Sequence, residues 1–307
     1  MGVSFLFSQH GLERRTMDYN VFTNVILASL QEKLPECTVA LKNVVKNNNV
    51  TLSAVCIKSE DVNAAPTIYL EQFYEAYLDG ESIEYITQEI IEIYERNKPE
   101  IDYDFAEIEE YENARNHLYF KAVNYESNDE FLSDVPYFRF EDLALVPYFH
   151  IKDGFFGDAS VVIHYDLFDK WKVERDTFYK NIMDNMENRF DYDFVPITDM
   201  LSRISGISLT EDCTDIGMYV LCSERQLYGA ALISVCSVLG KIAEAIESDY
   251  FIIPSSVHEL IIVRSDEAQD EDMLNDMVCE VNNTVVCAED YLSDHVYFYK
   301  RGIGITH

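Results

Sequence analysis

Positive charge is scarce in this chain of 307 residues, which has 23 Lys and Arg against 56 Asp and Glu. The formal net charge is −33, and the sequence pI is near 4.3. Binding to phosphate backbones or to anionic lipid surfaces requires Lys and Arg that replace condensed counterions. We therefore expect no direct nucleic-acid partner and no attraction to a membrane surface.

Long apolar runs are also missing. No window approaches the roughly 18 to 20 apolar residues that cross a bilayer, and no cleavable leader with a small-residue cleavage site is visible. The seven cysteines form an odd set, and several of them, such as Cys56 and Cys236, lie in apolar runs. This usage favours free thiols in a reducing compartment. We expect a cytoplasmic protein.

The spacings that fix a metal or a cofactor do not occur. Neither Gly-x-Gly-x-x-Gly nor the Walker pattern is present, which removes the usual phosphate cradles. After His258-Glu259, position 262 is Ile rather than the second His of a zinc-binding helix, and Cys279 and Cys287 have no Cys-x-x-Cys nearby. The sequence predicts no metal and no cofactor.

The chain does contain enough apolar and aromatic residues to form a hydrophobic core. Its hydrophobic fraction is 48%, and it contains 21 Tyr and 18 Phe, far more than disordered chains carry. A chain of this length can form two lobes. Helical and strand-like patterns alternate along it, which predicts an α+β fold with two lobes of mixed sheets covered by amphipathic helices.

The expected domain boundaries follow changes in pattern. Residues 1–16 lack any helical or strand period and are predicted to be a disordered extension. An N-terminal α+β lobe is expected at 17–190. The pattern weakens at 191–215, which we interpret as a junction, and a C-terminal α+β lobe is expected at 216–307.

Several local elements can be assigned in the first half of the chain. Apolar positions recur at helical spacing from Asp18 and stop before Pro35. A hairpin is predicted with strands at 38–46 and 50–58, joined by three asparagines that tolerate positive φ. Ser82 is expected to begin an isoleucine-striped helix. A further helix is predicted at 105–121.

The second half gives a comparable pattern. Ser223 and Gln226 have the spacing of a capping box, which predicts a helix at 227–246. Strand-like runs lie at 251–253, 260–263 and 296–299, and a helix is predicted at 271–281.

Polar, reactive side chains gather at two turns that border these strand-like runs. If the strands are neighbours, hydroxyls, imidazoles and carboxylates of the two turns meet at one opening. We predict this polar patch as the candidate site, and its members are Ser255, Ser256, His258, Glu259, Ser293, Asp294 and His295.

The patch supports two interpretations. In one, its side chains hydrogen-bond a partner protein or a small ligand without catalysis. In the other, it is a serine-type hydrolase in which Ser255 or Ser256 attacks, His258 or His295 accepts the proton, and Asp294 or Glu259 orients the imidazole. The Gly-x-Ser-x-Gly elbow that exposes many such nucleophiles is absent. A plain strand-to-strand turn also accounts for Pro254-Ser-Ser256.

A third hypothesis comes from charge. Residues 71–112 contain 15 Asp and Glu against Arg96 and Lys98. Carboxylates on successive helical turns can imitate a nucleic-acid backbone and occupy a basic, nucleic-acid-binding protein. Such a run is otherwise the solvated face of amphipathic helices.

Short segments between residues 17 and 301 carry a family resemblance. They are Lys46-Asn-Asn48 with its hairpin, Pro66-Thr-Ile-Tyr-Leu70, Gly80 before the isoleucine-rich helix, Met218-Tyr-Val-Leu221, Pro254-Ser-Ser-Val-His-Glu259, Met277-Val278, Val281-Asn282 and Leu292-Ser-Asp-His-Val-Tyr297. In them the chain resembles an uncharacterised domain-of-unknown-function family that is common in anaerobic gut Firmicutes. The resemblance implies a shared fold and a cytosolic bacterial origin, and it transfers no catalytic role.

Taken together, these patterns favour an acidic, cytoplasmic binding protein without catalysis. Its partner is expected to be a protein or a small ligand, and a two-fold homodimer is compatible with the sequence. The serine-type hydrolase and the acidic decoy remain the alternatives.

Overall fold

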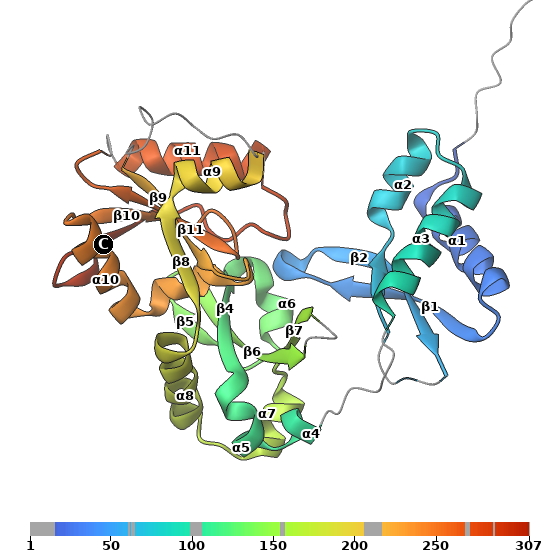
Figure 1. Ribbon diagram of the computed structural model, residues 1–307, viewed down its shortest axis with the longest axis horizontal. Coiled ribbons are helices and arrows are strands. Elements are labelled where there is room, and N and C mark those ends of the chain that lie inside the picture. Colours follow the sequence, from blue (N-terminus) through green and yellow to red (C-terminus); the bar gives the residue numbers. More distant parts are fainter. Residues whose placement is uncertain are drawn as a thin grey trace, which may run out of the picture. The chain divides into compact units, whose positions relative to one another are not determined.

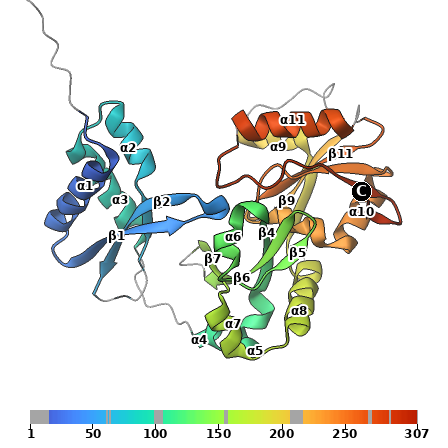
Figure 2. The same ribbon diagram turned by 180° about the vertical axis from the view of Figure 1, so that it is seen from behind.

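The computed structural model describes residues 16–60, 62, 65–98, 106–153, 157–205, 217–267, 271–284 and 286–306 (Figures 1 and 2). The chain divides into two compact units, and each is treated by itself below. The first comprises Met1–Val44 and Thr51–Tyr103, and the second comprises Val45–Val50 and Asp104–His307. The extension expected at 1–16 lies outside the described residues, except for Thr16.

In its described residues, the first unit packs three helices against a small sheet. Its elements are α1 (Tyr19–Lys33), β1 (Cys37–Val45), β2 (Thr51–Ser59), β3 (Thr67–Tyr69), α2 (Glu71–Leu78) and α3 (Ile83–Asn97). The sheet order is β1-β2-β3. Asp18 and Ser82 accept backbone N–H bonds at the starts of α1 and α3, and the helix start at Ser82 is the predicted one. Phe22, Ile26 and Ile90 are fully buried in its core, and each such side chain contributes about 1.5 to 3 kcal/mol by burial.

The hairpin between β1 and β2 turns through η1 (Asn47–Asn49). Asn48 and Asn49 have φ of 59° and 56°, the left-handed region that asparagine tolerates better than most residues. The hairpin and its asparagine turn are thus confirmed. This turn groups with the second unit, because its contacts lie there.

The second unit begins with an antiparallel sheet in the order β4-β6-β5, with β7 also pairing with β6. The elements of this part are α4 (Ala106–Glu109), α5 (Tyr111–Ala114), η2 (Arg115–His117), β4 (Leu118–Asn124), η3 (Glu126–Asn128), α6 (Asp129–Leu132), β5 (Phe138–Phe140), β6 (Leu143–Asp153), β7 (Gly157–Val162), α7 (Tyr165–Trp171) and α8 (Arg175–Asn188). Helix α8 covers one face of β4, where the Asn185 side chain donates to the Leu118 carbonyl at 2.9 Å.

The helix predicted at 105–121 is wrong. Two short helices and a 3-10 turn precede a strand that begins at Leu118. Helix-forming Glu and Ala dominate residues 106–114, whereas Leu118–Asn124 contains Tyr, Phe and Val, which suit a pleated surface. The residue pattern therefore changes inside the segment predicted as one helix.

A second sheet has the order β13-β12-β10-β11-β9-β8. This part contains β8 (Tyr192–Pro196), α9 (Ile197–Ser205), β9 (Met218–Ser223), η5 (Gly229–Ser234), α10 (Cys236–Ile246), β10 (Tyr250–Ile253), β11 (Glu259–Arg264), α11 (Glu271–Thr284), β12 (Tyr297–Lys300) and β13 (Gly304–Thr306). Helix α11 packs on one face of it, where Val278 joins Ile253 and Val263. On the opposite face, Tyr250 donates to the Leu239 carbonyl of α10 at 2.9 Å.

The fold class is α+β, as predicted, but the sheets are not mixed. Every strand pair of known register in the described residues is antiparallel. Consecutive strands such as β10 and β11 are joined by short turns, and a parallel pair would need a crossover of a dozen or more residues.

Among the described helices, none has the length and apolar character needed to cross a bilayer.

The boundary between units differs from the one expected at 191–215. Strand β8 lies in that range, and it pairs with β9 from Tyr192–Ser223 to Pro196–Tyr219. A strand held in a sheet joins its flanks instead of separating them. The contacts divide near residue 103 instead, and residues 206–215 of the expected junction lie outside the described residues.

The helix predicted at 227–246 begins nine residues later, at Cys236. Ser223 accepts the Leu227 N–H at 2.7 Å and donates to the Leu227 carbonyl at 2.9 Å, which closes a turn rather than a helix cap. The chain then enters η5 through Gly229. A Cβ at Gly229 would lie 2.5 Å from the His258 carbonyl oxygen and 2.5 Å from the Ser223 nitrogen. Only glycine allows so close an approach.

Candidate functional site

The two predicted turns lie at the same end of the second sheet. Strand β10 ends at Ile253, and β12 begins at Tyr297. Ile252 is paired with Tyr297, so the residues that follow β10 and those that precede β12 lie at the same end of the sheet. The turn that contains Ser255 and the segment that contains Ser293 therefore flank the same sheet end.

The two serine hydroxyls of the turn at 255–259 form hydrogen bonds within that turn. Ser255 Oγ donates to Glu259 Oε1 at 3.1 Å. Ser256 Oγ accepts the backbone N–H of His258 at 3.1 Å. These contacts shape the turn between β10 and β11.

The segment that contains Ser293 and Asp294 is held by side-chain hydrogen bonds to residues outside it. Ser293 is fully buried, and its Oγ donates to Asp142 Oδ2 at 2.6 Å while accepting the His295 N–H at 2.9 Å. Asp294 Oδ1 accepts from the Asn282 side chain at 2.9 Å, and His295 is exposed. Within the part of the chain that the structure describes, no hydrogen bond joins a serine hydroxyl of either turn to an imidazole ring.

A cleft of about 830 Å³ opens beside these turns. Of the seven residues in the predicted patch, His258 lines it and the other six do not. All its lining residues belong to the second unit: Val45, Lys46, Asn47, Lys121, Ala122, Val123, Glu130, Phe131, Ser133, Asp134, Val162, His164, Tyr228, Val257, His258, Glu289 and Asp290. A cleft of this size suits a small organic ligand.

Lys121 is the central group of the cleft. It lies in the middle of β4, opposite Val146 of β6. Its Nζ is 5.0 Å from the centre of the Phe131 ring and 5.4 Å from the centre of the Tyr228 ring. Aromatic faces attract a cation, each by about 0.5 to 2 kcal/mol depending on desolvation. The ammonium is thus flanked by rings rather than by carboxylates.

The electrostatic surroundings of Lys121 disfavour its charge. Burial, and then repulsion from Lys46, lower the pKa of Lys121 to about 8 from an ordinary 10.5. Among the described residues, no carboxylate lies within 4.0 Å of its Nζ. Its side chain is only partly exposed. Lysines with these properties bind anions when protonated and act as nucleophiles when neutral.

Two histidines face the same cleft, each beside a carboxylate. His164 Nδ1 lies 2.8 Å from Asp134 Oδ2. His258 Nε2 lies 3.6 Å from Asp290 Oδ1. The cleft therefore holds two imidazole–carboxylate pairs in addition to the lysine.

Asn47 adds an unsatisfied acceptor. Its Nδ2 donates to the Glu289 carbonyl at 2.8 Å and to the Tyr291 carbonyl at 3.3 Å, which fixes the orientation of the amide. Its Oδ1 is buried without a hydrogen-bond partner. A buried acceptor in this state costs about 1 to 3 kcal/mol until a donor reaches it.

Residues 19–301 match a family described as "Family of unknown function (DUF5688)". The chain belongs to this family. Comparison of this DUF5688 chain with curated proteins and with solved structures gave no match. The family description assigns no activity, so the site itself has to guide the assignment of function.

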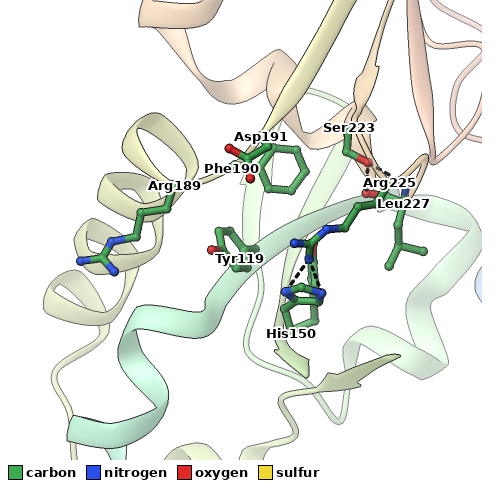
Figure 3. Close-up of a pocket in the computed structure, with 9 residues that line it drawn as sticks. Tyr119, His150, Arg189, Phe190, Asp191, Ser223, Arg225 and Leu227 are labelled. Carbon is green, nitrogen blue, oxygen red and sulfur yellow. Dashed lines mark hydrogen bonds between the residues drawn. The ribbon is translucent and has the colours of Figure 1, made fainter. Parts of the chain in front are cut away.

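The DUF5688 chain has a smaller cavity against the β4-β6-β5 sheet, lined in part by Tyr119, Tyr148 and His150. Its volume is about 40 Å³, room for water molecules and not for an organic ligand. Figure 3 shows the Arg225 side chain reaching over the His150 ring, while Arg189 points away from both. Arg225 Nη1 lies 2.6 Å from His150 Nε2 and 3.0 Å from His150 Nδ1, and a guanidinium can only donate, so the imidazole ring is the acceptor.

The two cavities of the DUF5688 chain are separated by aromatic rings. Tyr148 lines the smaller one, and Tyr228 lines the larger one. Their rings meet edge to face with centres 5.0 Å apart. The described residues contain no group of three or more His, Cys, Asp or Glu that could hold a metal ion.

Sequence reasoning missed Lys121, Phe131 and Tyr228 in this DUF5688 chain. The sequence pattern puts Lys121 at the end of one predicted helix and Tyr228 inside another. A signal for Lys121 is present, because it is the one charged residue in the seven-residue run Leu118–Asn124, which is otherwise apolar apart from its last position. A lone lysine in a buried strand indicates either a buried charge or a site.

Proposed function

We propose that this DUF5688 protein binds a small ligand in the Lys121 cleft, and that the ligand has an apolar body and an anionic group. The observation that carries the proposal is the position of the Lys121 amine, which lies between two aromatic rings and has no described carboxylate within 4.0 Å. The proposed function is binding without catalysis. This agrees with the interpretation of the sequence, but it moves the site from the turns to the cleft beside them.

The energetics favour a functional role for Lys121. Lowering its pKa from 10.5 to about 8 corresponds to about 3 kcal/mol of lost preference for the charged form. Partial exposure makes the effective penalty smaller. A Met or Leu would fill the same space without that cost, and residues that cost stability are concentrated at functional sites. An anionic ligand would offset the penalty directly.

The lining supports a mixed ligand. Phe131, Val123 and Val257 provide apolar contacts. Lys121 and Lys46 provide positive charge, and the same lining also contains the carboxylates of Glu130, Asp134, Glu289 and Asp290. Long polyanions are disfavoured by the remaining surface. A single carboxylate or phosphate on a small apolar body fits both features.

The hydrolase interpretation has less support. Ser255 and Ser293 donate to carboxylates, and Ser256 accepts a backbone N–H. None of these hydroxyls is hydrogen-bonded to an imidazole ring in the described residues, and nucleophilic serine requires such a base.

We also propose a cytoplasmic location in an anaerobic gut Firmicute. The resemblance found in the sequence supports the source. The described cysteines are all free, and Cys37 and Cys222 are buried, which suits a reducing compartment.

The test is calorimetric titration of the full-length protein with benzoate and with phenyl phosphate, using benzylamine as the cationic control. At pH 7 we expect saturable binding of at least one anion and none of benzylamine. Lys121→Met should lower the affinity about tenfold or more. Lys33→Met, at an exposed position in the first unit, is the matched control and should leave it unchanged.

The pH dependence is a second arm of the same test. The ammonium fraction of Lys121 falls about tenfold between pH 7 and pH 9 when its pKa is about 8, and anion affinity should fall with it. Equal affinity in wild type and Lys121→Met, or no binding of either anion, would overturn the proposal.

A further inference from the structure

We infer that Lys121 is a covalent attachment point, whose amine forms an imine with an aldehyde or ketone group of a ligand held in the cleft. The inference rests on the proposed function and extends it by naming the reactive group of the ligand. It adds a chemical step that simple anion binding does not require.

Geometry provides the first argument. An amine attacks a carbonyl only when it is uncharged, and no described carboxylate lies close enough to hold Lys121 in its charged form. Lys46, a second cation, faces the same cleft. Desolvation and a neighbouring cation are the two devices that make a lysine nucleophilic. Lys121 has both.

The pKa of about 8 gives the size of the effect. At pH 7, about one tenth of Lys121 is neutral, compared with about one part in three thousand for a lysine of pKa 10.5. A less basic amine is also an intrinsically weaker nucleophile, which offsets part of the rate increase that the larger neutral fraction gives. We therefore expect Lys121 to react at least tenfold faster than an exposed lysine.

The step balances without a further reagent. The nitrogen lone pair forms a bond to the carbonyl carbon, and the π electrons move to oxygen, which takes up a proton. The resulting carbinolamine loses its hydroxyl as water while the nitrogen gives up its proton. The net change converts one amine and one carbonyl into one imine and one water, with no oxidation or reduction.

Proton transfer groups are present in the same cleft. His258 accepts the Tyr228 N–H at Nδ1, so Nε2 carries the proton in the neutral ring. His164 is paired with Asp134 and His258 with Asp290. The other charged groups facing the cleft are Lys46, Glu130 and Glu289. An imidazole that carries a proton at Nε2 is suited to give it to the leaving hydroxyl.

The ligand class follows from the lining. The carbonyl is placed at Lys121, and an apolar or aromatic body lies against Phe131 and Tyr228. An anionic group on the same ligand is attracted by Lys46. Aromatic aldehydes and apolar oxo acids combine these features, and 4-carboxybenzaldehyde is a non-enolising probe that has all three.

The experiment treats the full-length protein with 4-carboxybenzaldehyde and sodium cyanoborohydride at pH 7, and it follows labelling by intact mass and peptide mapping. We expect one carboxybenzyl group at Lys121, formed at least tenfold faster than at Lys33. Benzoate should slow this labelling. Lys121→Arg should abolish the fast adduct and leave the slow background at Lys33. Mapping of the wild-type protein decides the site even if a variant folds poorly.

The pH profile separates the two proposals. Imine formation needs the neutral amine, so the equilibrium yield of imine, formed at each pH and then reduced by a short pulse of sodium borohydride, should rise with pH and level off above about 8, while benzoate affinity falls over the same range. Labelling spread evenly over exposed lysines would overturn the imine. If benzoate binding still depended on Lys121, the proposed function would stand. If neither probe depended on Lys121, both would fail.

Discussion

Tyr228 and His258 are joined twice: the Tyr228 N–H donates to His258 Nδ1 at 3.3 Å, and the two rings stack with centres 5.8 Å apart, 16° from parallel. Tyr228 holds a left-handed backbone conformation with φ of 57°, which is uncommon outside glycine, asparagine and aspartate. The pair fixes one wall of the Lys121 cleft, including the tautomer of the imidazole. Its position depends on the backbone of the next residue, Gly229.

Gly229→Ala should destabilise the protein. The added Cβ would meet backbone atoms of His258 and Ser223 at 2.5 Å, and backbone cannot give way as a side-chain end can. Overpacking of this kind costs about 1 to 3 kcal/mol. The midpoint of thermal unfolding should fall, and benzoate affinity should fall with it because Tyr228 is displaced.

The matched control is Gly240→Ala. Gly240 lies inside α10, and the atom nearest to an added methyl group there would be the Tyr299 hydroxyl at 3.6 Å, an ordinary contact. Alanine is the better helix former by about 0.5 to 1 kcal/mol. This variant should be as stable as wild type or more so, and equal losses in the two variants would contradict the close-approach argument.

Lys121→Met should stabilise the protein at neutral pH. The folded pKa of about 8 is below the ordinary 10.5, so the unfolded chain binds more protons between those values, and wild-type stability rises with pH across that window. The variant has no such dependence. At pH 7 it should be more stable by about 1 to 3 kcal/mol, and the difference should vanish towards pH 10.5. Urea unfolding at several pH values measures this, and a less stable variant at pH 7 would contradict it.

Tyr228 should contribute to ligand affinity through its ring. Tyr228→Phe keeps the stack on His258 and the face towards Lys121, so benzoate affinity should change less than twofold. Tyr228→Leu removes the aromatic face and should lower the affinity about three- to tenfold. Calorimetric titration of the two variants gives the comparison, and equal effects would show that the ring face is not used.

Asp142 should matter for stability more than any serine of the predicted patch. It accepts the Ser293 hydroxyl at 2.6 Å and also the Tyr297 hydroxyl. Burial, and then the adjacent carboxylate, raise the pKa of Tyr297 well above its ordinary value. Asp142→Ala leaves two buried donors without an acceptor and should cost about 2 to 4 kcal/mol.

Two further substitutions are the comparisons for Asp142→Ala. Ser293→Ala removes one donor and should cost about 1 kcal/mol, while His295→Ala, at an exposed position, should change stability by less than about 0.5 kcal/mol. Urea unfolding ranks the three variants. A larger loss for His295 than for Asp142 would show that the turn is held in some other way.

Local chemistry makes part of this structure predictable from sequence. The caps at Asp18 and Ser82 and the asparagine turn at 47–49 depend on residues within a few positions of one another. That the two C-terminal turns border strands was also predictable, because strand-like runs bound both. The features that sequence reasoning missed depend on distant partners, such as Asp142, which lies 151 positions from Ser293.

The cleft itself could not be read from the sequence for a related reason. Helix formers upstream of Leu118 favour a helix that extends through Lys121, and the strand there is stabilised by its pairing with β6. Tyr228 directly precedes the 3-10 helix η5, which leads to α10. The start of η5 requires Gly229 to lie close to the backbone of β9. Tertiary contacts override local preference at both positions, and these are the residues that line the site.

The bond between Ser293 and Asp142 has a practical consequence for anyone who shortens or fuses this protein. The segment from Ser293 onward supplies β12, β13 and an anchor for the carboxylate that precedes β6, so it is not a dispensable tail. A truncation that stops before Ser293 would remove those strands from their sheet and leave the half-buried Asp142 carboxylate without its two hydroxyl donors.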